Sequence, residues 1–277
     1  VDKSELMISN LIKTSSSIAV VNATSGIQVA LQLAGVKEGN DVLTQALTFV
    51  ATSNAIIYNK ANPVFIDVDL DTMGLSAKHV EIFLETYGDL REDGCYNLSS
   101  GNKIGACLPV HTFGFPVHIE DLIKVCDKWK IPVVEDAAES LGSTYKGIPT
   151  GSFGKLGVFS FNGNKITTSG GGGMITTNDN TLGKKAKHIT TTAKVPNLIG
   201  FRHDQLGFNF RMPNINAALL CAQLEQLDYY LKSKRELAEI YEDFFFKKGI
   251  LFRKEIKNTK SNYWLMCIEL ENVSDKK

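Results

Sequence analysis

Lys165 is the residue of this sequence best placed to act as an amine nucleophile. It follows an apolar run at residues 158–161 and precedes four consecutive glycines at residues 170–173. Glycine lets the backbone approach a ligand closely, and a lysine amine removed from water has a lowered pKa and can attack a carbonyl carbon. A lone lysine is more commonly a solvated surface charge, so other groups must decide its role.

Polar groups also follow two predicted strands. Asp136 comes directly after an apolar run and either caps the next helix or faces a cationic nitrogen. Thr24 and Ser25 stand at a predicted helix start, where free N–H groups and the helix dipole favour a phosphate, although a simple N-cap would use the same residues. Neither the dinucleotide glycine fingerprint nor the Walker A pattern is present.

These groups together match the requirements of pyridoxal 5′-phosphate. That cofactor needs a lysine for a Schiff base, a carboxylate at its pyridine nitrogen and a phosphate site. Lys165, Asp136 and the segment around Thr24 and Ser25 can supply them, and Phe49 is an aromatic residue that follows a strand.

The elements that must position these residues alternate between short β-branched runs and helical patterns, which predicts parallel βαβ units in a three-layer α/β/α fold. We expect strands at 17–21, 41–43, 63–67, 106–110, 132–135, 158–161 and 174–177, and helices at 27–33, 48–58, 76–87, 119–130 and 182–188. Residues 88–103 form a polar surface excursion, and residues 193–210 are irregular. A long helical pattern from residue 214 to 245 and a strand-like run at 264–270 follow. The predicted domains are a large cofactor-binding domain, 1–245, and the beginning of a smaller, truncated α+β domain, 246–277.

Composition narrows the class of partner. The 277 residues carry 30 Lys+Arg and 30 Asp+Glu, and this balance removes the strongest argument for a nucleic-acid-binding protein, because counterion release needs a basic face. No run of apolar residues is long enough to span a membrane. Five widely spaced cysteines with no metal-binding spacing predict reduced thiols, a cytoplasmic protein and no bound metal.

Several blocks of the sequence, taken in chain order, match the conserved blocks of one protein family. They are VVNATSGIQVAL, TFVATSNAI, VVEDAAESLGSTYKG, TGSFGKLGVFSFNGNKI, GGGGMI and GFNFRMPNINAALLCAQL. The chain resembles the DegT/DnrJ/EryC1/StrS sugar aminotransferases, of pyridoxal phosphate fold type I, over residues 17–245. Within them it looks most like the branch that aminates C4 of UDP-4-keto-6-deoxy-N-acetylhexosamines. Family members are about 100 or more residues longer, so we expect this chain to be a fragment or a trimmed form.

The resemblance implies a role for each candidate residue. Lys165 would be the Schiff-base lysine, Asp136 the partner of the pyridine nitrogen and Phe49 the residue that stacks on the ring. The phosphate would be held by Thr24, the backbone around Ser25, Ser160 and, across a homodimer interface, Asn209. Glu139 replaces a common Gln near the cofactor's 3-oxygen, so it should be protonated or turned away. His111, in VHTFG at a position that matches the family, is expected to pack and support the cofactor loop, with catalysis as the alternative role.

The implied activity is transfer of an amino group from glutamate to a 4-keto nucleotide sugar in polysaccharide or glycan biosynthesis. A pyridoxal phosphate-dependent sugar dehydratase is a second reading, but the dehydratase relative has His in place of the lysine. A non-catalytic regulatory or binding protein with this fold is a third. An NAD oxidoreductase is excluded by the missing glycine fingerprint.

Overall fold

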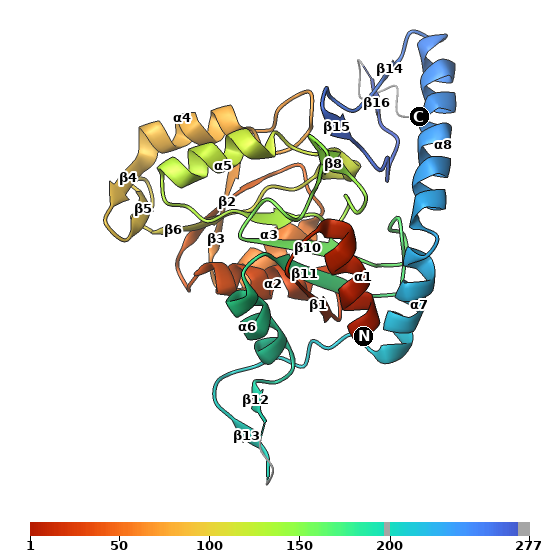
Figure 1. Cartoon of the computed structure of the whole chain (residues 1–277). Helices are drawn as coiled ribbons and strands as arrows, with labels where there is room; N and C mark the ends of the chain where they lie inside the picture. The colour runs from red at the N-terminus through yellow and green to blue at the C-terminus, as the bar shows by residue number, and fades with distance from the viewer. Residues whose placement is uncertain (197–199, 271–277) are drawn as a thin grey trace.

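The computed structural model describes residues 1–196 and 200–270 (Figure 1). In chain order the elements are α1 (Asp2–Ile12), β1 (Ser16–Val20), α2 (Ala23–Ala34), β2 (Asp41–Gln45), α3 (Val50–Tyr58), β3 (Asn62–Ile66), α4 (Ala77–Tyr87), β4 (Gly88–Arg91), β5 (Gly94–Asn97), β6 (Ile104–Cys107), the 3₁₀ turn η1 (Thr112–Gly114), α5 (Ile119–Lys128), β7 (Val134–Asp136), β8 (Thr144–Tyr145), β9 (Ile148–Pro149), β10 (Leu156–Ser160), β11 (Gly173–Thr177), α6 (Asn180–Thr190), β12 (Lys194–Val195), β13 (Arg202–His203), α7 (Asn214–Leu224), α8 (Leu227–Phe246), β14 (Leu251–Phe252), β15 (Thr259–Lys260) and β16 (Ile268–Glu269).

The central sheet has the strand order β3-β2-β6-β7-β10-β11-β1, in which β6 and β7 meet through parallel bridges between Cys107 and Val133 and between Val110 and Asp136. β2 is parallel to β3 and β6, and β10 is parallel to β7. β11 is antiparallel to both of its neighbours, β10 and β1. The prediction of a mainly parallel sheet is therefore confirmed.

Helices cover both faces of this sheet (Figure 1). Neighbouring residues of one strand show the alternation: Val42 packs in the cluster under α2, α3 and α6, whereas Leu43 packs in the cluster under α4 and α5. A third cluster joins α1 and α7 to Phe159 and Met174 of β10 and β11. The inner strands β2, β6, β7, β10 and β11 bury both faces, as expected of a sheet between helix layers, whereas the edge strand β3 is partly exposed. The three-layer architecture is confirmed.

Several segments differ from the expectations, and the stretch 193–210, expected to be irregular, holds the short strands β12 and β13. The sequence predicts no element at residues 2–12, which form helix α1. Ile8 and Ile12 of this helix lie about one turn apart and are fully buried. The surface excursion at 88–103 contains the antiparallel β4–β5 hairpin, in which Cys95 of β5 is fully buried. The long helix is divided into α7 and α8 at residues 225–226, where Gln226 leaves the helical region at φ −107° and ψ 3°.

The segment after α8 packs closely on the large domain. β15 pairs with β8, and the Asn262 amide donates to the carbonyls of Glu139 and Leu141, at 2.9 Å each. Of the strand-like run at 264–270, only Ile268–Glu269 is a strand, paired with β14. The proposed boundary at residue 246 stays a prediction, and residues 271–277 of the second domain lie outside the described part. In residues 1–196 and 200–270, no helix combines the length and apolarity needed to cross a membrane.

Candidate active site

A cavity of about 290 Å³ opens at the carboxyl edge of the sheet, between the first turns of α2 and α3 and the ends of β7 and β10. This is the edge at which α/β sheets bind ligands. Of the predicted residues, six line the cavity: Thr24, Phe49, Asp136, Glu139, Ser160 and Lys165. Ser25 and Asn209 are not among the lining residues.

Asp136 ends β7 and is 3% exposed. Thr52 Oγ1 donates to its Oδ2 at 2.7 Å, and the Ala138 N–H donates to its Oδ1 at 3.1 Å. Burial raises the pKa of the carboxyl, while these two hydrogen bonds and the nearby Lys165 charge act in the opposite direction. Asp136 therefore presents a carboxylate oriented by donors. No helix lies between β7 and β8, so the expected helix cap is absent, and the bond to Ala138 closes the turn that follows β7.

Lys165 lies in the turn after β10, and its amine faces two side chains. Its Nζ is 3.5 Å from Glu139 Oε1 and 3.7 Å from the centre of the Trp264 ring. Burial lowers the pKa of Lys165, and the carboxylates of Glu139 and Asp136 oppose that shift. The amine is thus partly desolvated, as a nucleophile or proton acceptor requires.

Glu139 points into the cavity and is not turned away from it. Its Oε2 accepts a 2.7 Å hydrogen bond from the Phe113 N–H, and its Oε1 faces Lys165. Burial raises the pKa of the Glu139 carboxyl, with Lys165 and the Phe113 amide acting against that shift. Of the two expectations for Glu139, that it is turned away is wrong, and that it is protonated stays a prediction.

Helix α2 begins earlier than predicted, at Ala23, and its N-cap is Asn22. Asn22 Oδ1 accepts from the Ser25 N–H at 2.8 Å, which occupies the amide that the sequence offered to a phosphate. The first turn of a helix leaves the amides of Ala23 and Thr24 without intrahelical partners, and both residues line the cavity. Gly173 of β11 lies against this turn, because a Cβ there would stand 2.7 Å from Ala23 N.

Ser160 and Phe49 both line the cavity. Ser160 ends β10 and is 9% exposed, with its hydroxyl accepting from the Asn162 N–H at 3.4 Å. Phe49 precedes α3, lines the cavity and is 71% exposed. An aromatic ring that is open on one face and borders a cavity can stack on a planar ligand.

Asn209 lies in the irregular segment before α7, on the surface. Its Oδ1 accepts from the Nε and Nη2 atoms of Arg211, at 3.2 and 3.1 Å. Within its own subunit it does not reach the cavity. The neighbouring Phe208 and Phe210 rings stack at 4.6 Å and pack on the core, so the loop is held from beneath while Asn209 faces outward.

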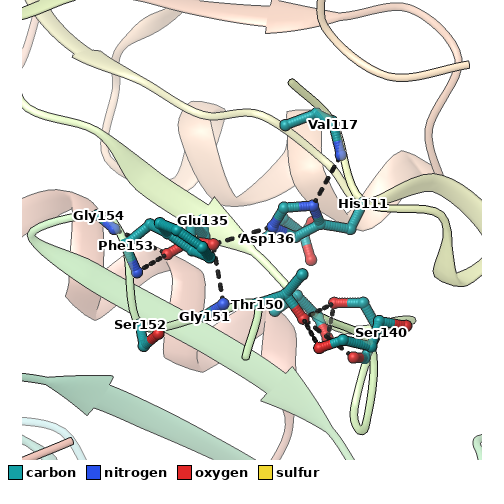
Figure 2. Close-up of polar contacts among 12 residues, drawn as sticks. His111, Val117, Glu135, Asp136, Ser140, Thr150, Gly151, Ser152, Phe153 and Gly154 are labelled. Carbon is teal, nitrogen blue, oxygen red and sulfur yellow. Dashed lines mark hydrogen bonds and ion pairs between the residues drawn. The ribbon is translucent and has the colours of Figure 1, made fainter. Parts of the chain in front are cut away.

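His111 and Glu135 form a fully buried pair behind the site (Figure 2). Glu135 Oε2 is 2.9 Å from His111 Nε2 and accepts from the Gly151 N–H at 2.8 Å. Its Oε1 accepts from the Phe153 and Gly154 N–H groups, both at 2.7 Å. This pair fixes the 150–154 turn against β7, in line with the supporting role expected for His111.

Sequence reasoning missed Thr52 and Trp264. Thr52 is three residues after Phe49, in the first turn of α3, so the spacing that places Phe49 at the site also places Thr52 there. Trp264 is almost a hundred residues beyond Lys165 in sequence, at the start of the strand-like run predicted at 264–270. No local pattern could have brought it to the cavity.

Comparison with known proteins agrees with this geometry. The family model for the DegT/DnrJ/EryC1/StrS aminotransferases matches residues 1–277. A Bacillus subtilis (strain 168) protein named as a pyridoxal phosphate-dependent aminotransferase, EpsN, is 37% identical over 98% of this chain and 68% of its own length. The GDP-perosamine synthase of Escherichia coli O157:H7 is 37% identical over 90% of this chain and 64% of its own length.

Solved structures show the same fold. An aminotransferase from Psychrobacter cryohalolentis is 27% identical, with a TM-score of 0.82 over 95% of this chain and 67% of its own. A Brucella abortus protein of the same family superposes with a TM-score of 0.88 over 99% of this chain and 70% of its own, at 24% identity. This chain thus spans about two thirds of the length of these relatives. The cofactor of the family is pyridoxal 5′-phosphate, as the sequence predicted, and the chain belongs to the DegT/DnrJ/EryC1/StrS aminotransferase family.

Proposed function

We propose that this chain carries the cofactor site of an aminotransferase that moves an amino group from glutamate to a 4-keto nucleotide sugar, with pyridoxal 5′-phosphate as cofactor. One observation carries the proposal: a partly desolvated lysine amine and a buried carboxylate share one cavity with the start of a helix. These are the three groups that the cofactor requires.

The residues present fit the cofactor. The first turn of α2 offers amides for the phosphate, and Gly173 leaves room for that turn where a Cβ would displace it. Ser160 adds a hydroxyl donor on the same side, and Thr24 can add another. Asp136 is oriented by Thr52 and Ala138, so a carboxylate oxygen is available for the pyridine nitrogen.

The cofactor, when bound, supplies an electron sink for the carbon from which a proton is removed. The chain's own groups do the rest. Asp136 holds a proton on the pyridine nitrogen, because a buried carboxylate favours a cation beside it. Lys165, lowered in pKa by burial, accepts and returns a proton at its Nζ. Trp264, 8% exposed, covers the cavity and limits the access of water to that amine.

The nucleotide-sugar substrate is supported by the relatives. GDP-perosamine synthases from several bacteria are at least 30% identical to this chain. We assign a 4-keto sugar and glutamate on the resemblance in the sequence blocks, with polysaccharide or glycan biosynthesis as the setting. The five cysteines, all in the described residues, are unpaired, which supports a reducing cytoplasmic compartment.

A homodimer with shared sites is part of the proposal. The segment that carries β12 and β13 projects away from the body of the domain (Figure 1). Its Phe201 and Leu206 are each 84% exposed, and Asn209 faces outward rather than into its own cavity. Exposed apolar side chains on a projecting segment favour an interface, and the site of a second copy is the place where Asn209 would contact a phosphate.

Covalent labelling tests the cofactor site. Borohydride reduction of the protein with pyridoxal phosphate, followed by peptide mapping, should mark Lys165. Lys165→Ala should abolish the mark, while Lys155→Ala, whose Nζ contacts the Ala34 carbonyl at 3.5 Å, should retain it. A mark at Lys155, or none, contradicts the proposal. With glutamate and 4-keto nucleotide sugars, an aminated product separates aminotransferase from dehydratase, and absence of product in the longest natural form supports a binding protein.

Mixing two inactive variants tests the shared site. Asn209→Ala should lower cofactor affinity, and mixing it with Lys165→Ala should form heterodimers with one intact site and regained activity. A monomer by sedimentation that still binds the cofactor tightly rules the shared site out.

A further inference from the structure

The amine of Lys165 is held between an aromatic face and a carboxylate. Its Nζ is 3.7 Å from the centre of the Trp264 ring and 3.5 Å from Glu139 Oε1. A cation over an indole face is attracted by the ring quadrupole, and this attraction is strongest where water is excluded. Lys165 and Glu139 are 13% and 8% exposed at their side chains, so both contacts lie in such an environment.

Trp264 is fixed in this position from both ends. Its indole Nε1 donates to the Asn164 carbonyl at 2.7 Å, in the turn that carries Lys165. Its backbone N–H donates to Asn262 Oδ1 at 2.9 Å. The ring is therefore built against the lysine turn and does not depend on a chance side-chain rotamer.

Asn262 connects the two walls of the amine position. Its Oδ1 accepts from Trp264, and its amide donates to the backbone carbonyl of Glu139 at 2.9 Å. Gly114 makes this connection possible, because a Cβ there would stand 1.9 Å from Asn262 Oδ1. Glu139 itself is held by the Phe113 N–H at 2.7 Å, so neither wall can move independently.

We infer that Trp264 and Glu139 form a rest site that holds the Lys165 amine whenever that amine is not joined to the cofactor. The inference rests on the proposed function, in which an amino donor takes the place of the lysine and the lysine then handles protons. A released lysine has a flexible four-carbon stem, so a fixed position keeps its amine near the reacting carbon. Glu139 stabilises the charged amine, and the ring provides attraction without accepting its proton.

The charged groups that face the amine define what its titration should show. Glu139 and Asp136 both favour the protonated amine, and burial opposes it. Glu139→Gln is close to isosteric and keeps an oxygen for the Phe113 N–H, so the fold should survive. Removing this carboxylate should lower the pKa of the Lys165 amine by about one unit.

Trace acetylation of the cofactor-free chain measures that pKa directly. The rate of acetylation of Lys165 by acetic anhydride, followed by mass spectrometry across pH, gives the midpoint of the amine, with Lys155 as the internal control. We expect Glu139→Gln to shift the Lys165 midpoint down by about one unit and to leave Lys155 unchanged. At a pH below the midpoint we expect Trp264→Leu to speed acetylation of Lys165 by about tenfold, because loss of the cation–π partner favours the neutral amine and loss of the covering ring admits the reagent.

Trp264 also reports on the site without any change to it. The chain has 2 tryptophans, and the other, Trp129, has a buried Nε1 without a hydrogen-bond partner in the described part of the chain. Trp129→Phe should therefore be tolerated and leave Trp264 as the sole tryptophan emitter. Its emission should change at the same pH midpoint as Lys165 acetylation, and Lys165→Met should remove that transition.

The results separate the rest site from the proposed function. The rest site is overturned if Trp264 emission does not change at the pH midpoint of Lys165 acetylation. It is also overturned if the Glu139→Gln variant has the same Lys165 midpoint as the parent. Both readouts use the chain without cofactor, so they stand apart from borohydride labelling. A labelled Lys165 with no coupling to Trp264 and Glu139 refutes only the rest site. Coupling without labelling refutes the proposed function, and with it the role of these contacts as a rest site.

Discussion

Replacing Glu135 with glutamine should be among the most destabilising isosteric changes in the domain. The side chain is fully buried, and its two oxygens accept from His111 Nε2 and from the N–H groups of Gly151, Phe153 and Gly154 (Figure 2). Every contact of this carboxylate is thus with a donor. Glutamine keeps one oxygen and replaces the other with an amide that can only donate.

The magnitude follows from the donors left without an acceptor. If the glutamine oxygen faces Phe153 and Gly154, its amide meets the Gly151 N–H and His111 Nε2. His111 cannot simply move its proton to Nδ1, because that nitrogen accepts from the Val117 N–H at 3.3 Å. Two unsatisfied buried donors at about 1–3 kcal/mol each lower the free energy of unfolding by about 2–6 kcal/mol. Domains of ordinary stability have only about 5–15 kcal/mol.

Urea denaturation of the cofactor-free chain measures this loss, provided that the dependence of the unfolding free energy on urea concentration has the same slope in parent and variant. Glu81→Gln is the matched control, since Glu81 pairs with Lys128 at 3.0 Å and is 41% exposed at its side chain. That change should cost about 1 kcal/mol or less. A Glu135→Gln variant that unfolds at the same urea concentration as Glu81→Gln refutes the view that Glu135 holds the 150–154 turn through ionic acceptors.

Two substitutions test the residues that would hold the cofactor, and one labelling experiment tests the thiols. Gly173→Ala should weaken pyridoxal phosphate binding in a spectral titration by about tenfold, because overpacking costs about 1–3 kcal/mol, whereas Gly171→Ala, which has open space at its Cβ, should not. Thr52→Val removes the 2.7 Å donor to Asp136 and should also cost about tenfold in cofactor affinity, with exposed Thr86→Val as the control. In native protein a thiol reagent should reach Cys267 before the four buried cysteines, and slowly at neutral pH, because burial raises the pKa of its thiol to about 11.

The sheet and the centre of the site follow from local sequence features. Apolar β-branched runs separated by helical patterns predict parallel strands, and the carboxyl ends of such strands meet at one edge. Asp136 and Ser160 each end a strand, so their proximity is a consequence of strand order. Lys165 comes five residues after Ser160, too few for it to leave that edge.

The remaining parts depend on contacts between distant segments. Trp264 enters the site because Asn262 bonds the carbonyls of Glu139 and Leu141, an interaction with no periodic signal. The predicted start of α2 was too late because Asn, Thr and Ser are all good N-caps, and only the structure shows that Asn22 is the one used. The residues between α7 and α8 include neither glycine nor proline, so helix propensity does not predict a break there.

Asp136→Asn should have opposite effects on stability and on catalysis: the cofactor-free chain should be at least as stable, and transamination should fall. Burial raises the folded-state pKa of Asp136 above its ordinary value, so the folded chain binds a proton that the unfolded chain has released. The free energy of unfolding therefore falls as pH rises through the window between the unfolded and folded pKa values, and the penalty is complete above the folded pKa. Asparagine carries no charge and can keep both contacts, accepting from the Ala138 N–H and donating to Thr52, whose hydroxyl can turn to Thr48 at 2.6 Å.

Without cofactor, Asp136→Asn should accordingly be at least as stable as the parent at neutral pH and should lose this part of the pH dependence. With cofactor, the variant lacks the carboxylate for the pyridine nitrogen, and transamination should fall by about a hundredfold or more. Thermal unfolding across pH and single-turnover assays measure the two effects on the same preparations. If the variant is less stable than the parent and as active, Asp136 is only the cap of the turn that follows β7, because a cap contributes to folding and leaves chemistry untouched.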